Sequence, residues 1–137
     1  MAPQIRVLLA DDETVFLESL AKVMSRRGMV VATAGDGMAA LERLASEPFD
    51  IIVLDMRMPR LDGLATLAAI RQTDVLTPVL LLSGHADLEQ ATAALRHGAS
   101  DFLLKPCPVD TLISAIEDAA EHSALRRQLS QDTHPEE

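Results

Sequence analysis

The chain has 137 residues, of which 48% are hydrophobic, so it fits a single domain with a sizeable buried core. Its formal net charge of -9 argues against binding of nucleic acid or an anionic membrane by these residues alone, because both need a basic protein surface. One cysteine excludes an internal disulfide framework, no apolar run reaches the roughly 18 residues of a membrane span, and residues 1–4 do not form a signal peptide, so we expect a cytoplasmic protein.

Strands and helices are predicted to alternate five times along the chain. Apolar runs predict strands over residues 5–10, 29–34, 50–55, 78–83 and 101–105. Helical spacing of apolar residues predicts helices over residues 14–27, 37–46, 63–72, 87–97 and 109–122.

The ends of the predicted helices carry residues that favour helix caps. Asp36, Asp62 and Asp87 stand where N-caps are expected, and Gly28 follows the first helix as a C-terminal glycine would. Within the first helix, an apolar stripe is formed by residues that recur at helical spacing: Phe16, Leu20, Val23 and Met24.

The pattern of the central strands indicates the fold. Residues 51–54 and 79–82 are continuous apolar runs, which indicates burial on both faces and therefore helices on both sides of a parallel sheet. Five strand–helix units with right-handed crossovers leave few arrangements. We predict an α/β fold of the flavodoxin-like, doubly wound type, with a five-stranded parallel sheet in the order 2-1-3-4-5 flanked by five helices.

The composition changes near residue 122. Residues 1–122 are predicted to form one domain, whereas residues 123–137 are polar and are predicted to be a helix extension, a linker or a tail. Leu125 and Leu129 are the large apolar residues of this segment, and two leucines are too few to predict a coiled coil.

Four of the predicted strands end on polar residues that can take part in chemistry. The first is followed by Asp11 and Asp12, the third ends on Asp55, the fourth on Ser83 and the fifth on Lys105. Because the carboxyl ends of parallel strands lie along one edge of the sheet, these side chains should meet there. Three neighbouring carboxylates repel one another unless one takes up a proton or a cation neutralises them, and Mg²⁺ prefers oxygen ligands. The set therefore predicts a site for Mg²⁺ and a phosphoryl group.

Each of these residues also has an ordinary structural interpretation when it is taken alone. Asp11 and Asp12 would form a turn and cap the next helix, Ser83 would lead into a helix, and Lys105 would be a solvated surface residue. The four strand ends taken together favour the functional interpretation. No spacing of histidines and cysteines suggests zinc.

The segments around these strand ends resemble the receiver domain of two-component response regulators. They are VLLADDE at 7–13, VLDMRMPRLDG at 53–63, LSG at 82–84 and GASDFLLKP at 98–106. The resemblance extends over roughly residues 4–122, and its motifs occur in the order and at the spacing of the family.

By this resemblance, Asp55 is the phosphoacceptor. Asp11, Asp12 and Asp55, together with the backbone carbonyl of Arg57, would hold Mg²⁺. The chemistry agrees with these roles, because a carboxylate nucleophile that attacks phosphorus requires mainly alignment and charge compensation from the protein.

The resemblance also implies a switch. Lys105 would bind the phosphoryl group, with a cis Lys105–Pro106 bond, while Ser83 and Phe102 would occupy the two switch positions. Without the resemblance, Phe102 would be interpreted as a half-buried residue of an edge strand. His85 and the residue two positions after Asp55 would tune the lifetime of the phosphoryl group.

Three other functions fit the sequence less well than this one. A phosphotransferase of the haloacid dehalogenase type would carry a second aspartate two residues after the nucleophile, where this chain has Arg57. A flavodoxin-like nucleotide carrier would need a Gly- or Ser/Thr-rich loop after the first strand, where the acidic residues 11–13 would repel phosphate in the absence of a metal. A receiver-like module that no longer accepts phosphate is disfavoured by the intact set of strand-end residues.

Partners follow from the resemblance as well. A sensor histidine kinase or a phosphotransfer protein would donate the phosphoryl group, and the chain is not expected to be an enzyme. The face formed by the fourth helix, the fifth strand and the fifth helix is the expected output surface and would support a phosphorylation-dependent homodimer. An output domain or a partner protein is expected beyond Glu137, and direct binding of nucleic acid or membrane by this domain is not.

Overall fold

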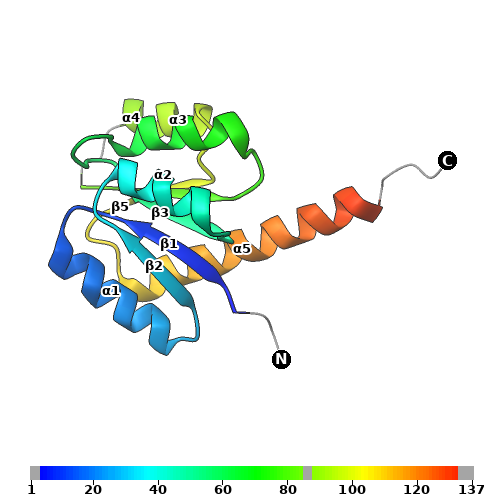
Figure 1. The fold of residues 1–137 in the computed structure, drawn as a ribbon, viewed down its shortest axis with the longest axis horizontal. Coiled ribbons are helices and arrows are strands. Elements are labelled where there is room, and N and C mark those ends of the chain that lie inside the picture. Colours follow the sequence, from blue (N-terminus) through cyan, green and yellow to red (C-terminus); the bar gives the residue numbers. More distant parts are fainter. Residues whose placement is uncertain (1–3, 85–87, 133–137) are drawn as a thin grey trace.

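The computed structural model describes residues 4–84 and 88–132, which form one sheet between two layers of helices (Figure 1). The five strands are β1 (Arg6–Ala10), β2 (Val30–Ala34), β3 (Ile51–Asp55), β4 (Val79–Ser83) and β5 (Asp101–Leu104). All pairings are parallel, and the strand order is β2-β1-β3-β4-β5. The predicted topology is confirmed.

Helices cover both faces of the sheet, as the continuous apolar strands predicted. The helices are α1 (Thr14–Arg26), α2 (Gly37–Ser46), α3 (Gly63–Thr73), α4 (Leu88–Arg96) and α5 (Val109–Asp132). Every residue of β3 and β4 is buried, because alternate side chains of each strand enter opposite layers of the core. One core layer joins the sheet to α2, α3 and α4, and the other joins it to α1 and α5.

Three of the predicted cap residues lie at the ends of helices, as expected. The side chain of Asp36 accepts a hydrogen bond from the Ala39 amide at the start of α2, and Asp62 accepts one from Ala65 at the start of α3. Gly28 follows α1 with a φ of 90°, a left-handed conformation that favours glycine. Asp87 and His85 lie outside the described residues.

Helix α5 runs past residue 122, where the fifth helix was predicted to end, and reaches Asp132 beyond the sheet (Figure 1). Of the three alternatives for the polar segment, residues 123–132 adopt the helix extension. Ser123 is buried and donates a hydrogen bond of 3.4 Å to the carbonyl oxygen of Leu76. Arg127 donates one of 3.3 Å to the hydroxyl of Thr77. The extension therefore packs against the loop that precedes β4, a tertiary contact that its polar composition does not reveal.

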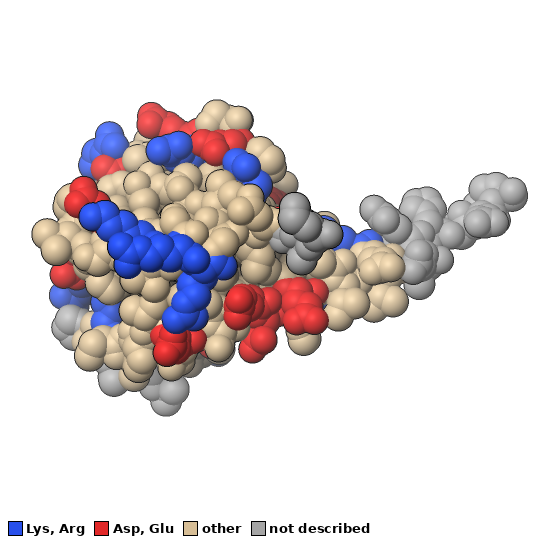
Figure 2. Space-filling model, turned by 90° about the horizontal axis from the view of Figure 1, so that it is seen from below, with Lys and Arg blue, Asp and Glu red and all other residues tan. Residues whose placement is uncertain are grey.

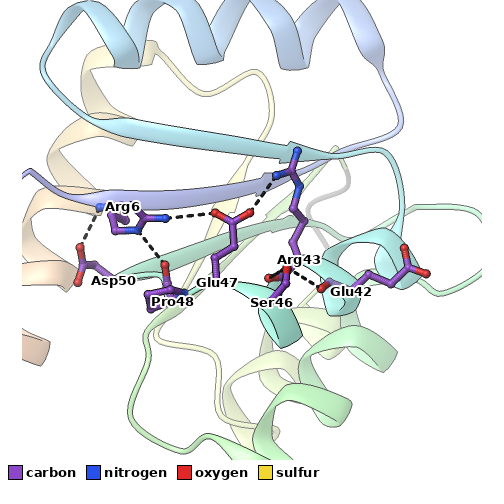
Figure 3. Close-up of polar contacts among 7 residues, drawn as sticks. All are labelled: Arg6, Glu42, Arg43, Ser46, Glu47, Pro48 and Asp50. Carbon is purple, nitrogen blue, oxygen red and sulfur yellow. Dashed lines mark hydrogen bonds and ion pairs between the residues drawn. The ribbon is translucent and has the colours of Figure 1, made fainter.

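A polar network joins the amino end of β1 to the connection between α2 and β3 (Figure 3). The guanidinium of Arg6 pairs with Glu47, which also pairs with Arg43 of α2. Arg6 donates a further hydrogen bond to the Pro48 carbonyl, and its amide donates to Asp50. These contacts fix the connection from α2 to β3 at the end of the sheet opposite to the strand-end residues.

A band of Lys and Arg side chains crosses the face seen in Figure 2. Acidic side chains lie near the ends of this band and in a further group toward the C-terminal extension. Arg27, directly after α1, pairs with Asp110 of α5 at 2.5 Å. Among the described helices, none is both long and apolar enough to cross a bilayer.

Candidate functional site

The polar residues at the strand ends meet at the carboxyl edge of the sheet. Asp11 follows β1, Asp55 is the last residue of β3, and Lys105 follows β5. The ammonium nitrogen of Lys105 lies 2.8 Å from a carboxylate oxygen of Asp11 and 3.4 Å from one of Asp55. The parallel topology thus brings together residues that are as much as 94 positions apart in the sequence.

Three carboxylates form a cluster that fits a divalent cation. Asp11, Asp12 and Asp55 each offer an oxygen, and these oxygens lie within 4.8 Å of one another. Asp11 and Asp55 are buried, whereas Asp12 is exposed to solvent. Clustered oxygen ligands of this kind match the preference of Mg²⁺, and the exposed side leaves room for water or a phosphoryl oxygen.

The electrostatics of Asp55 reflect this crowding. Burial is the largest cause that raises the pKa of Asp55, the neighbouring charge of Asp11 adds to it, and Lys105 acts in the opposite direction. The resulting pKa is about 6, against an ordinary value of 3.8. The folded protein therefore destabilises the ionised form of Asp55 relative to the protonated form, and a cation bound in the cluster would relieve this effect.

Lys105 is held from several sides. Its ammonium also lies 3.2 Å from a carboxylate oxygen of Glu13, and 4.8 Å from the centre of the Phe16 ring. Burial lowers the pKa of Lys105, but the carboxylates of Asp11 and Asp55 outweigh it, so the pKa is raised and the group stays charged. The sequence singled out neither Glu13 nor Phe16 as a neighbour of this lysine.

The two switch positions lie on neighbouring strands. Phe102 is half-buried and sits beside Leu81 of β4 in the parallel register, while Ser83 is buried two residues further along β4. Because side chains alternate along a strand, Ser83 and Phe102 point toward the same face of the sheet, the one covered by α4. The amide of Lys105 donates to the Ser83 carbonyl at 2.7 Å, and the Lys105–Pro106 bond is cis, as the resemblance implied.

A small cavity opens at the acidic cluster. It has a volume of about 300 Å³ and is lined by Asp12, Glu13, Asp55, Met56, Arg57, Gly84 and Lys105. Arg57 therefore lies at the site, in the loop where the resemblance places its carbonyl.

Gly63 is a further positioning residue that the sequence did not single out. Its amide donates to the Met56 carbonyl at 3.0 Å, which holds the start of α3 against the end of β3. A Cβ atom at this position would lie 2.5 Å from the carbonyl oxygen of Asp55. Only glycine allows this close approach, and its place directly after the N-cap Asp62 gives a weak signal in the sequence.

Comparison with known proteins identifies relatives. A model of the response regulator receiver domain matches residues 7–117. Response regulator MprA of Mycobacterium tuberculosis is 37% identical over 131 residues, which cover 89% of this chain and 57% of MprA. The DNA-binding transcriptional regulator NtrC of Escherichia coli is 34% identical over 122 residues, which cover 89% of this chain and 26% of NtrC. The chain thus spans about half the length of MprA and about a quarter of NtrC.

Solved structures agree with these matches. The receiver domain of the Francisella response regulator 1452 superposes with a TM-score of 0.83 at 31% identity, covering 88% of this chain and 99% of the other. NtrX from Brucella abortus, solved in complex with ADP, superposes with a TM-score of 0.89 at 34% identity, covering 98% of this chain and 31% of NtrX. The chain therefore belongs to the receiver domain family of two-component response regulators.

Proposed function

We propose that this chain accepts a phosphoryl group on Asp55 from a sensor histidine kinase or a phosphotransfer protein, and that it acts in the cytoplasm as a signal carrier and not as an enzyme. The observation that supports the proposal most strongly is the local environment of Asp55. Its carboxylate ends a fully buried strand, clusters with two other carboxylates and lies 3.4 Å from the ammonium of Lys105.

The proposed reaction is a displacement at phosphorus. A carboxylate oxygen of Asp55 forms a bond to phosphorus, while the bond from phosphorus to the donor atom, such as a histidine nitrogen, breaks. Lys105 compensates negative charge on the phosphoryl oxygens, and the rigid ends of β1 and β3 align the reacting groups. Asp11, Asp12, Asp55 and the Arg57 carbonyl would hold Mg²⁺, which when bound supplies further charge compensation.

The switch in this proposal begins at Ser83. A phosphoryl group on Asp55 adds negative charge and acceptor oxygens, and the Ser83 hydroxyl can donate a hydrogen bond to one of these oxygens. Ser83 and Phe102 point to the same face of the sheet, so a shift of the first changes the space available to the second. The element biased by phosphorylation would be the surface formed by α4, β5 and α5.

A groove beside β5 and α5 supports a docking role. It has a volume of about 690 Å³ and includes Asp101 and Leu103 of β5 and Thr111, Asp118 and His122 of α5. The exposed side chains of Leu95 and Leu104 lie on the same set of elements. We propose that a phosphorylation-dependent homodimer or an output partner binds here.

We further propose that residues 1–122 form the receiver domain and that residues 123–137 connect it to an output domain or a partner protein beyond Glu137. The helical extension of α5 as far as Asp132 is a suitable connector, since it leaves the domain in a defined direction. In this proposal the receiver domain itself contacts neither nucleic acid nor membrane, because its formal net charge is -9.

The proposal is tested by intact mass after incubation with Mg²⁺ and acetyl phosphate. The wild type should gain the mass of one phosphoryl group, and Asp55→Asn should gain none. Equal labelling of the two proteins would overturn the assignment of Asp55, and a wild type that takes no label from any small phosphodonor would favour an interaction module that does not accept phosphate.

A further inference from the structure

The environment of Lys105 contains a contact that the proposed phosphoryl transfer does not explain. The Lys105 side chain is 16% exposed, and its ammonium faces Asp11 and Asp55 on the side of the acidic cluster. On the α1 side it faces the ring of Phe16, whose centre is 4.8 Å away. That distance lies within the range at which a cation is attracted to the face of an aromatic ring.

We propose that Phe16 is a positioning residue that holds the ammonium of Lys105 over the phosphorylation site. The inference rests on the proposed function, because it assigns Phe16 a role in phosphoryl transfer to Asp55. Phe16 itself touches none of the reacting atoms in this role and acts through Lys105.

The start of α1 is built in a way that supports this role. Glu13 is the N-cap residue of α1, yet its side chain makes no capping hydrogen bond and instead pairs with Lys105 at 3.2 Å. Phe16 lies in the first turn of the same helix and is half-buried against the core layer of α1 and α5. The ring is therefore fixed by packing, while the lysine that it contacts has a long and flexible side chain.

The ring of Phe16 acts differently from the carboxylates of Asp11 and Glu13, which also contact Lys105. In the proposed function Lys105 turns from Asp11 toward the phosphoryl oxygens when Asp55 is modified, so some of its contacts are exchanged. A carboxylate competes for the ammonium with a fixed negative charge and a directed hydrogen bond. The face of Phe16 attracts the ammonium without neutralising it and tolerates a small displacement, so the charge stays available to the phosphoryl group.

The test compares Phe16→Leu with Phe16→Tyr. Leucine keeps an apolar side chain for core packing but removes the ring, whereas tyrosine keeps the ring. With acetyl phosphate at a fixed Mg²⁺ concentration, Phe16→Leu should lower the second-order rate constant of phosphorylation about 3- to 10-fold, and Phe16→Tyr should stay within about twofold of the wild type.

Phe49→Leu is the matched control. Phe49 also faces a cation, with the Arg6 guanidinium 5.8 Å from its ring centre, but it lies in the loop before β3 at the other end of the sheet. Its replacement should leave the rate constant within about twofold of the wild type. Melting temperatures of all variants establish that each is folded under the assay conditions.

A second measurement reads the contact directly. The ring should shift the NMR signals of the Lys105 methylene protons upfield in the wild type and in Phe16→Tyr, and Phe16→Leu should abolish this shift. If the wild type is phosphorylated and Phe16→Leu is phosphorylated equally fast, this inference is overturned and the proposed function stays intact. Phosphorylation of Phe16→Tyr as slow as that of Phe16→Leu would overturn the inference too. A wild type that is not phosphorylated at all would overturn both proposals.

Discussion

The ammonium group of Lys105 lies closer to Asp11 than to Asp55, at 2.8 Å from the first carboxylate and 3.4 Å from the second. The other oxygen of Asp11 accepts a hydrogen bond of 2.9 Å from the Glu13 amide, so both oxygens of Asp11 are engaged. A cation that binds the acidic cluster must therefore share Asp11 with Lys105. Because these charged groups are crowded together, the stability of the protein should change when a cation binds the cluster or when Asp55 takes up a proton.

Mg²⁺ should stabilise the fold without phosphate. The ion relieves repulsion among Asp11, Asp12 and Asp55, and the unfolded chain has no preformed site. Millimolar Mg²⁺ should raise the melting temperature of the wild type by about 3 to 6 °C, and the rise should shrink strongly in Asp12→Ala. Asp118→Ala, which removes an acidic residue of α5, should respond as the wild type does. A response that Asp12→Ala leaves unchanged would show that the ion binds elsewhere.

Metal-free stability should depend on pH through Asp55. Its pKa is raised to about 6 from an ordinary 3.8, chiefly by burial and then by Asp11, so the folded state binds the proton more tightly than the unfolded state. The ionised carboxylate thus opposes folding, and this unfavourable effect develops as pH rises from about 4 through about 6.

Asp55→Asn should remove that effect. In EDTA at pH 8 the variant should have a free energy of unfolding about 1 to 2 kcal/mol above that of the wild type, and this advantage should shrink toward pH 4. Urea denaturation across this pH range gives the difference. A difference that stays constant with pH would contradict the raised pKa.

The parts of this site that could be predicted from the sequence follow from one rule of topology. Continuous apolar runs predict buried parallel strands, and parallel strands bring their carboxyl ends to one edge. That was sufficient to expect Asp11, Asp55 and Lys105 to meet, and the distances among them confirm that they do.

The remaining parts depend on contacts that leave little trace in the sequence. Phe16 fits the apolar stripe of α1, so its spacing gives no sign that the ring also faces Lys105, 89 positions later. The need for glycine at position 63 comes from the backbone of Asp55. The extension of α5 is polar, so the sequence gives no sign that Ser123 and Arg127 contact the loop before β4.

Gly63→Ala should disturb the site from outside it. The added Cβ would lie 2.5 Å from the Asp55 carbonyl oxygen and 2.8 Å from the Cα of Met56, and backbone atoms cannot give way as a flexible side chain does. We expect a loss of about 1 to 3 kcal/mol in the free energy of unfolding and slower phosphorylation of Asp55.

Gly35→Ala is the matched control, because a Cβ atom there would meet no atom within 4 Å. Its free energy of unfolding should stay within about 0.5 kcal/mol of the wild type. Equal stabilities of the two variants in urea denaturation would show that α3 moves away from β3 without cost.

Ser83→Ala should separate phosphorylation from its output. The variant keeps Asp55, Lys105 and the acidic cluster, so intact mass should still detect one phosphoryl group. Loss of the hydroxyl removes the proposed donor to that group, which should weaken phosphate-dependent dimerisation or partner binding by about tenfold. Sedimentation with and without phosphodonor measures the dimer, and a dimer unaffected by Ser83→Ala would remove Ser83 from the switch.

Beryllofluoride, which stands in for the phosphoryl group, should locate the output surface. Backbone NMR signals should shift mainly within residues 83–108, since Ser83 and Phe102 share the sheet face under α4. One or two new charge-assisted hydrogen bonds are enough to bias two states that differ by a few kcal/mol. Large shifts confined to α1 and α2 would show that this choice of surface is wrong.

Arg71 joins three segments around the loop that supports the α5 extension. Its guanidinium donates to the Gly98 carbonyl at 2.8 and 3.0 Å, to the Asp74 carbonyl at 3.0 Å and to the Thr77 carbonyl at 2.7 Å. The Arg71 side chain is half-buried, and this burial lowers the pKa of its guanidinium. Loss of this group would leave backbone carbonyls without their donors.

Arg71→Met should therefore release the extension of α5. We expect the free energy of unfolding to fall by roughly 2 to 3 kcal/mol, because hydrogen bonds to a charged group are among the stronger ones. Amide hydrogen exchange should increase most in residues 123–132, whose contacts through Ser123 and Arg127 depend on the loop. Arg126→Met, at an exposed position of the same helix, is the control and should change neither quantity appreciably. If exchange in the extension were the same in both variants, the helix beyond residue 122 would hold its structure by local propensity, and the loop before β4 would have no part in directing it.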